Sequence, residues 1–81
     1  MRVTVRLFAR AKELAGAADV EVELIDGATV ADLRRSLAAA YPALTALLSQ
    51  AAVAVDDDFA DDAHLLSPSS EVALLPPVSG G

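Results

Sequence analysis

The feature that most restricts the fold of this chain is one amphipathic helical segment with alternating, strand-like segments on both sides of it. Thr29 is a predicted N-cap, and Val30, Leu33 and Leu37 then recur at helical spacing. The helix must end before Pro42, because a residue that precedes proline is pushed out of the α region. In a chain of 81 residues, such a helix can bury its apolar stripe only against one face of a small sheet.

Several other segments alternate apolar and polar residues, as half-buried strands do. We predict strands at 2–8, 20–25, 52–55 and 71–75, a short strand at 59–60, a short helix at 9–15 stopped by Gly16, and a second short helix opened by Pro42. This order predicts an α+β fold, with a mixed β-sheet and one main helix packed on one face. We place Arg34 and Arg35 on the solvated face of that helix, with Arg35 paired weakly to Asp32.

Composition excludes several classes of function. The chain has no cysteine, which excludes disulfides, a thiolate nucleophile and thiolate metal sites. Its net charge of −6 and dispersed basic residues argue against nucleic acid and anionic membrane as partners. No apolar stretch approaches the ~18 residues of a membrane span, and no signal peptide is seen, so we expect a cytoplasmic protein.

The acidic run at 56–62 and the single histidine are both interpreted as surface features without a catalytic or metal-binding role. The acidic run at 56–62 lacks the central Gly and terminal Glu of an EF-hand, so we interpret it as a solvated loop and expect no metal site. An alternative is that this run steers the protein toward basic partner surfaces. His64 is the only histidine and is interpreted as a surface or turn residue. We expect no cofactor.

The C-terminal segment is the most distinctive part of the sequence. The chain ends Pro76-Pro77-Val78-Ser79-Gly80-Gly81 after an apolar strand. The prolines close that strand, and terminal glycines are conformationally permissive. We therefore predict a domain at 1–75 and a flexible tail at 76–81, whose one distinctive chemical group is the α-carboxylate of Gly81.

The whole chain resembles the MoaD/ThiS sulfur-carrier family of ubiquitin-like β-grasp proteins, and most closely its molybdopterin synthase branch. The matching residues are Phe8-Ala9, Glu13-Leu14 and Gly16 near the start, Thr29-Val30 and Leu33 at the main helix, and the run from Glu71 to Gly81. Pro-Pro-Val-x-Gly-Gly after an apolar strand is the specific part of this match.

The resemblance implies a function for the tail. In the family, an ATP-dependent adenylating enzyme activates the terminal carboxylate, which becomes a thiocarboxylate and donates sulfur to cyclic pyranopterin monophosphate in molybdenum cofactor biosynthesis. Gly81 would carry the sulfur covalently. Gly80, which has no side chain, would let the tail pass through a narrow channel. This chain would form a heterotetramer with the large subunit of the synthase. The catalytic residues would lie on the large subunit, so this chain would be a non-catalytic sulfur-donor subunit.

The alternation of the strands adds a predicted partner interface. If Val3, Val5 and Leu7 face the helix, Phe8 and Leu75 point to the open face of the sheet, with Ile25 nearby. We predict that Phe8 and Leu75, with the tail residues Pro76, Pro77, Val78 and Ser79, contact the partner. The opposing interpretation is that Phe8 and Leu75 are isolated or covered by the short helix.

Three other functions stay open from the residues alone. The chain could carry sulfur for thiamine synthesis, tRNA thiolation or cysteine synthesis. It could be a ubiquitin-like modifier joined through Gly81 to target lysines. It could also be an interaction module whose tail does no chemistry.

Overall fold

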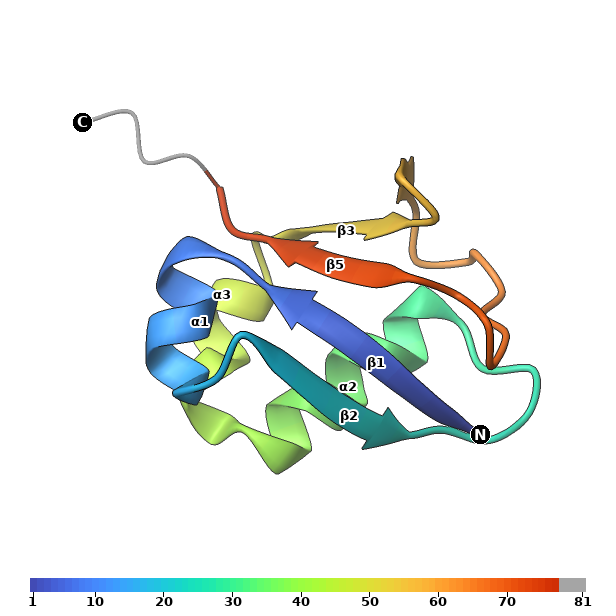
Figure 1. The fold of residues 1–81 in the computed structure, drawn as a ribbon, viewed down its shortest axis with the longest axis horizontal. Coiled ribbons are helices and arrows are strands. Elements are labelled where there is room, and N and C mark those ends of the chain that lie inside the picture. The colour runs from blue at the N-terminus through green and yellow to red at the C-terminus, as the bar shows by residue number, and fades with distance from the viewer. Residues whose placement is uncertain (78–81) are drawn as a thin grey trace.

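The last strand of the chain lies in the middle of the sheet. The computed structural model describes residues 1–77, and its strands form one mixed sheet in the order β2-β1-β5-β3-β4 (Figure 1). The strands are β1 (Arg2–Leu7), β2 (Asp19–Glu23), β3 (Ala52–Val55), β4 (Asp58–Ala60) and β5 (Val72–Leu75). Strand β5 pairs parallel with β1 and antiparallel with β3. Backbone pairing on both sides therefore anchors the strand from which the C-terminal tail continues.

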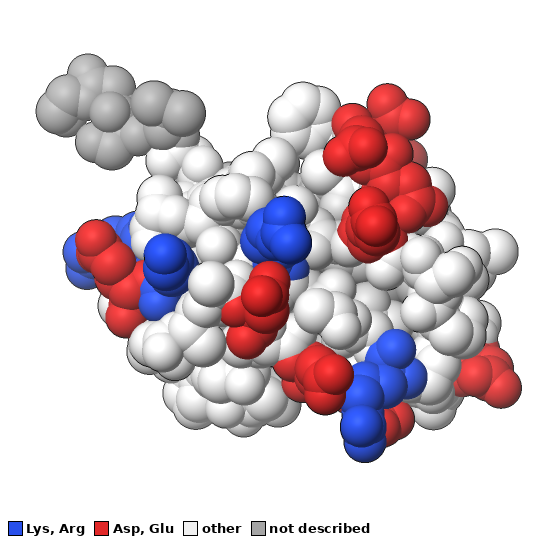
Figure 2. All heavy atoms as spheres, viewed as in Figure 1, with Lys and Arg blue, Asp and Glu red and all other residues white. Residues whose placement is uncertain are grey.

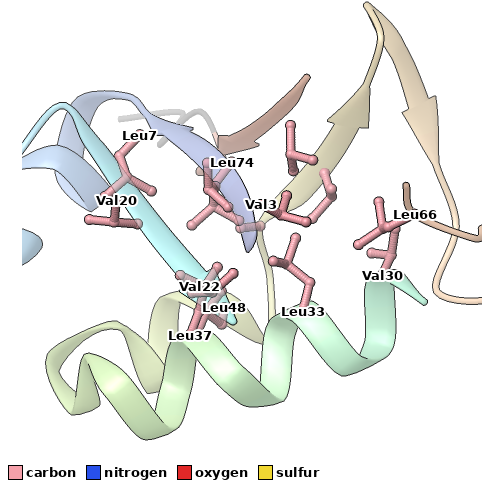
Figure 3. Packing of buried hydrophobic residues seen from close by; sticks show 14 of the residues in the cluster. Val3, Leu7, Val20, Val22, Val30, Leu33, Leu37, Leu48, Leu66 and Leu74 are labelled. Carbon is pink, nitrogen blue, oxygen red and sulfur yellow. The ribbon is translucent and has the colours of Figure 1, made fainter. Parts of the chain in front are cut away.

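One face of the sheet is covered by helices, as the sequence predicts. The helical elements are α1 (Ala9–Ala15), α2 (Val30–Ala40), the 3-10 turn η1 (Pro42–Leu44) and α3 (Thr45–Leu48). Inward side chains of the strands, including Val3, Leu7 and Val22, pack over Leu33 and Leu37 of α2 (Figure 3). The predicted segments are confirmed to within one or two residues at each end. No helix within residues 1–77 has the length and apolar character needed to cross a membrane.

Helix α2 begins with an N-terminus whose backbone donors are satisfied. The Thr29 hydroxyl accepts a bond from the Asp32 N–H, and the Asp32 carboxylate accepts one from the Thr29 N–H, which completes a capping box. The N–H groups of Val30 and Ala31 donate to the carbonyls of His64 and Asp62 at 3.0 Å each. The loop at 61–64 thus serves as part of the helix cap, and the predicted N-cap at Thr29 is confirmed.

Helix α1 ends at Gly16, as predicted. Gly16 has φ 74°, and its N–H donates to the carbonyl of Lys12 at 2.9 Å. At the other end of the helix, Ala9 has φ 50°, a left-handed angle that is unfavourable for a residue with a Cβ. This left-handed residue lies directly after Phe8, where the chain turns from β1 into α1.

The turn between β3 and β4 is built from two aspartates. Asp56 and Asp57 have φ 51° and 72°, and the paired register Val55↔Asp58 leaves these two residues as the loop. Two positive φ angles define a type I′ hairpin, for which Asp is among the tolerated residues. Asp56 also exchanges two bonds with Glu71: its N–H donates to the Glu71 carbonyl at 2.8 Å, and its carboxylate accepts the Glu71 N–H at 2.9 Å. The hairpin turn is thereby tied to the residue that precedes β5.

The prediction that Arg34 lies on a solvated helix face is wrong. Its side chain is only 24% exposed, and Nη1 donates to the carbonyls of Leu48 at 2.6 Å and Ala51 at 2.8 Å. Those carbonyls lie where the chain leaves α3 and enters β3. The helical spacing of residues in α2 gives no information about contacts with such distant segments. Arg35 is 71% exposed and pairs with Asp32, as predicted.

Candidate functional site

Phe8 and Leu75 lie next to each other at the end of the two central strands. The parallel register pairs Leu7 with Leu74, and both of these side chains are buried on the helix side. Phe8 follows the end of β1 with an extended backbone, and Leu75 is the last residue of β5, so each points to the face opposite its buried neighbour. Phe8 is 41% exposed and Leu75 is half-buried, so both reach the open face.

The neighbouring positions of this face are small and apolar. Ala52 is the register partner of Leu75, and Ala54 is the partner of both Ala73 and Phe59. Cross-strand partners share a face of the sheet. We call this stretch the open-face patch, and it comprises Phe8, Ala52, Ala54, Phe59, Ala73 and Leu75.

Phe59 is the large apolar member of the patch that the sequence analysis did not predict. It is 76% exposed, the second most exposed of the large apolar residues described. The signal was available: a two-residue turn at Asp56 and Asp57 puts Phe59 opposite Ala54, an outward position of β3. The predicted short strand at 59–60 is confirmed, and its register turns Phe59 to the open face.

Ile25 does not join the patch, and the expectation that it lies nearby is wrong. Leu24 donates its N–H to the carbonyl of Met1, which places Ile25 beside the start of β1. Phe8 follows the other end of the same strand, roughly 20 Å away at the usual rise per residue. The physical reason is that β2 runs antiparallel to β1, so the end of β2 lies beside the start of β1.

The predicted tail starts beside this patch. Strand β5 ends at Leu75, after which Pro76 is half-buried and Pro77 is exposed. The end of β5 lies next to α1, at the end of the sheet where Phe8 is found (Figure 1). The predicted tail residues Val78, Ser79, Gly80 and Gly81 lie outside the described residues.

The titratable groups of residues 1–77 form no evident catalytic cluster. His64 is exposed, and no set of three or more His, Asp or Glu side chains in this range could hold a metal ion. The pKa of Asp32 lies below its ordinary value of 3.8, chiefly because the Thr29 backbone N–H donates to the carboxylate. Since Asp32 caps α2, its lowered pKa reflects helix capping. The most distinctive surface of the described residues is therefore the apolar open-face patch next to the end of β5.

The strand order and the placement of the main helix define a ubiquitin-like β-grasp domain, as predicted. The family model described as "ThiS family" matches residues 5–81, so the chain belongs to this family. The sequence is 36% identical, over the full length of both chains, to a protein of Chlamydomonas reinhardtii named molybdopterin synthase sulfur carrier subunit.

Two solved structures show the same fold over the full length of both chains. SAMP1 from Haloferax volcanii matches with a TM-score of 0.88 and 31% identity. A chain in the protein-protein complex of subunits 1 and 2 of the molybdopterin-converting factor from Helicobacter pylori matches with a TM-score of 0.71 and 27% identity. The predicted resemblance to sulfur carriers is confirmed.

Proposed function

We propose that this chain is the sulfur carrier subunit of a molybdopterin synthase and acts in molybdenum cofactor biosynthesis. The observation that carries the proposal is the position of β5: the strand is paired on both sides, and it delivers the chain to Pro76 and Pro77 beside the open-face patch. The name of the Chlamydomonas relative supports this assignment. The two-subunit complex from Helicobacter supports a large-subunit partner.

The carrier chemistry is assigned to the carboxylate of Gly81. A carboxylate is a poor electrophile, so an adenylating enzyme first joins it to AMP, and pyrophosphate leaves ATP. Hydrosulfide supplied by a donor then attacks the acyl carbon, the bond to the AMP oxygen breaks, and AMP leaves to give the thiocarboxylate. The chain has no cysteine, so no side-chain thiol of its own competes for the sulfur.

The remaining residues of the tail serve delivery. Gly80 and Gly81 lack side chains and would pass through a channel too narrow for other residues. Pro76, Pro77, Val78 and Ser79 would contact the large subunit along that path, with Phe8 and Leu75 docking at its mouth. The large subunit supplies the catalytic residues, two copies of each chain form the synthase, and we place the reaction in the cytoplasm.

Intact mass spectrometry tests the proposal. The protein is incubated with ATP, the adenylating enzyme and a sulfur source, and replacement of one oxygen by sulfur should raise its mass by about sixteen daltons. A variant lacking Gly81, and one extended by a residue after Gly81, should show no gain. Adding the large subunit and cyclic pyranopterin monophosphate should return the mass to its original value. If the full-length chain gains no mass with a competent enzyme, the carrier function is wrong.

A further inference from the structure

The open face of the sheet contains a depression that overlaps the open-face patch. Its lining includes Thr4 and Arg6 of β1, Ala73 of β5 and Ala54 of β3, with Asp57 and Glu71 at the hairpin side. Arg6, Ala73 and Ala54 are register partners in one row across the three strands. The depression exists because two methyl side chains occupy the middle of this row, whereas longer side chains surround them.

The basic side chain that lines this depression has an acidic partner, whereas two of the acidic side chains have no basic partner. Arg6 lies 3.5 Å from Asp19, so its charge already has a partner. By contrast, neither Asp57 nor Glu71 has a cationic group within 4.0 Å anywhere in residues 1–77. Figure 2 shows acidic side chains gathered over the corner that carries the β3–β4 hairpin, with uncharged surface between them and the basic groups.

Asp57 and Glu71 both line the depression, and both belong to segments that are tied together through Asp56. The paired bonds between Asp56 and Glu71 fix the hairpin turn against the residue that precedes β5. Asp56 uses its own carboxylate in that contact, whereas Asp57 and Glu71 keep theirs free of any bond to the described residues. A cation bound in the depression would be attracted by both of these unpaired carboxylates.

We propose that the depression receives one lysine or arginine side chain from the large subunit, with its charge bound between Asp57 and Glu71. The aliphatic part of such a side chain would lie on Ala54 and Ala73, and its charged end would reach the carboxylates. An anionic side chain would be repelled, and an apolar one would desolvate both carboxylates without compensation. The depression adjoins Phe8, which also lines it, so apolar and charged contacts form one continuous surface.

This inference rests on the proposed function, because it names the large subunit as the partner. The test is calorimetric binding of the large subunit from the same organism to the variant Asp57→Asn/Glu71→Gln. Asparagine tolerates the left-handed backbone at position 57, and glutamine keeps the backbone bonds at position 71. The matched control is Asp26→Asn/Asp61→Asn, which removes the same charge at positions outside the depression.

The expected result is that the Kd of the test variant rises about tenfold at about 50 mM salt, and by less at about 300 mM, since screening weakens the lost interaction. The control should bind within about twofold of the original chain. Binding of the test variant equal to that of the control would overturn the inference, as would a large subunit that does not bind the original chain. The mass gain at Gly81 decides the carrier function separately, so the two failures are distinguishable.

Discussion

The guanidinium of Arg34 lies 2.8 Å from the carboxylate of Asp62, and it joins three segments that are distant in the sequence. Its Nε donates to Asp62 in the loop that caps α2, while Nη1 donates to the carbonyls of Leu48 and Ala51. The side chain therefore holds the main helix, the end of α3 and the start of β3 together. Because β3 pairs with β5, this contact also supports the strand that carries the tail.

Replacing Arg34 should destabilise the protein much more than replacing its neighbour. Arg34→Met keeps much of the apolar stem but leaves two carbonyls without their donor, so we expect a loss of about 2 kcal/mol in the free energy of unfolding. Arg35→Met is the matched control: its side chain is 71% exposed, and the change should cost under about 0.5 kcal/mol. Urea denaturation of both variants measures the difference. Equal losses would contradict the role given to Arg34.

Arg34 also illustrates which part of the fold the sequence could predict. Local patterns were sufficient where the cause is local: the capping box at Thr29, the stop at Gly16 and the inward stripe of α2 all follow from residues close together in the chain. The partners of Arg34 lie 14 and 17 residues away, so helical periodicity could assign the residue only to an outer face.

Only the local features of the candidate site could be predicted from the sequence, because its other features depend on contacts between distant segments. Strand alternation gave the directions of Phe8 and Leu75, but their adjacency depends on the parallel pairing of β1 with β5. Strand order is a long-range property, and without it Ile25 was misplaced and Phe59 was not recognised as part of the same face. The function proposed for the tail depends on the resemblance to a known family, since Gly-Gly alone carries no chemistry beyond a carboxylate.

The capping carboxylate should make part of the stability depend on acid pH. The pKa of Asp32 is lowered from 3.8 in the folded state, so the cap stabilises the protein fully above that value. Its contribution is lost as the pH falls through the folded pKa. We expect Asp32→Ala to lower Tm at pH 7, and the difference from the original chain should shrink below about pH 4. Asp26→Ala, at a 97% exposed position, is the control. A Tm difference independent of pH would contradict this explanation.

The residues at the two ends of helix α1, Ala9 and the C-cap Gly16, should respond differently to substitution. Gly16→Ala places a Cβ at φ 74° with open space around it, so backbone strain alone should cost about 1 kcal/mol. Ala9→Gly relieves the strain at φ 50°, which offsets the greater freedom of glycine in the unfolded chain, and stability should stay level or rise by up to about 0.5 kcal/mol. Thermal unfolding of the pair tests this; a larger loss at Ala9 than at Gly16 would show that the φ angles do not govern these sites.

The open-face patch should contribute to partner binding more than to folding. Phe8→Ala combined with Leu75→Ala removes side chains that are only partly buried, so Tm should remain nearly unchanged. Truncation of an aromatic and an aliphatic anchor at an interface costs about 1–3 kcal/mol, so affinity for the large subunit should fall about ten- to a hundredfold. Calorimetric titration of the large subunit into each variant measures this loss.

Control variants distinguish a loss of specific docking from the general effect of removing an exposed apolar side chain. Leu65 is 67% exposed and Ile25 is 77% exposed, and neither belongs to the patch, so Leu65→Ala and Ile25→Ala should leave the affinity unchanged. Phe59→Ala should weaken binding, because Phe59 shares the face of Ala54. A large fall in Tm for the Phe8 and Leu75 variant would instead make them part of the core. An affinity loss for Leu65→Ala as large as that for Phe8→Ala would move the interface away from the tail.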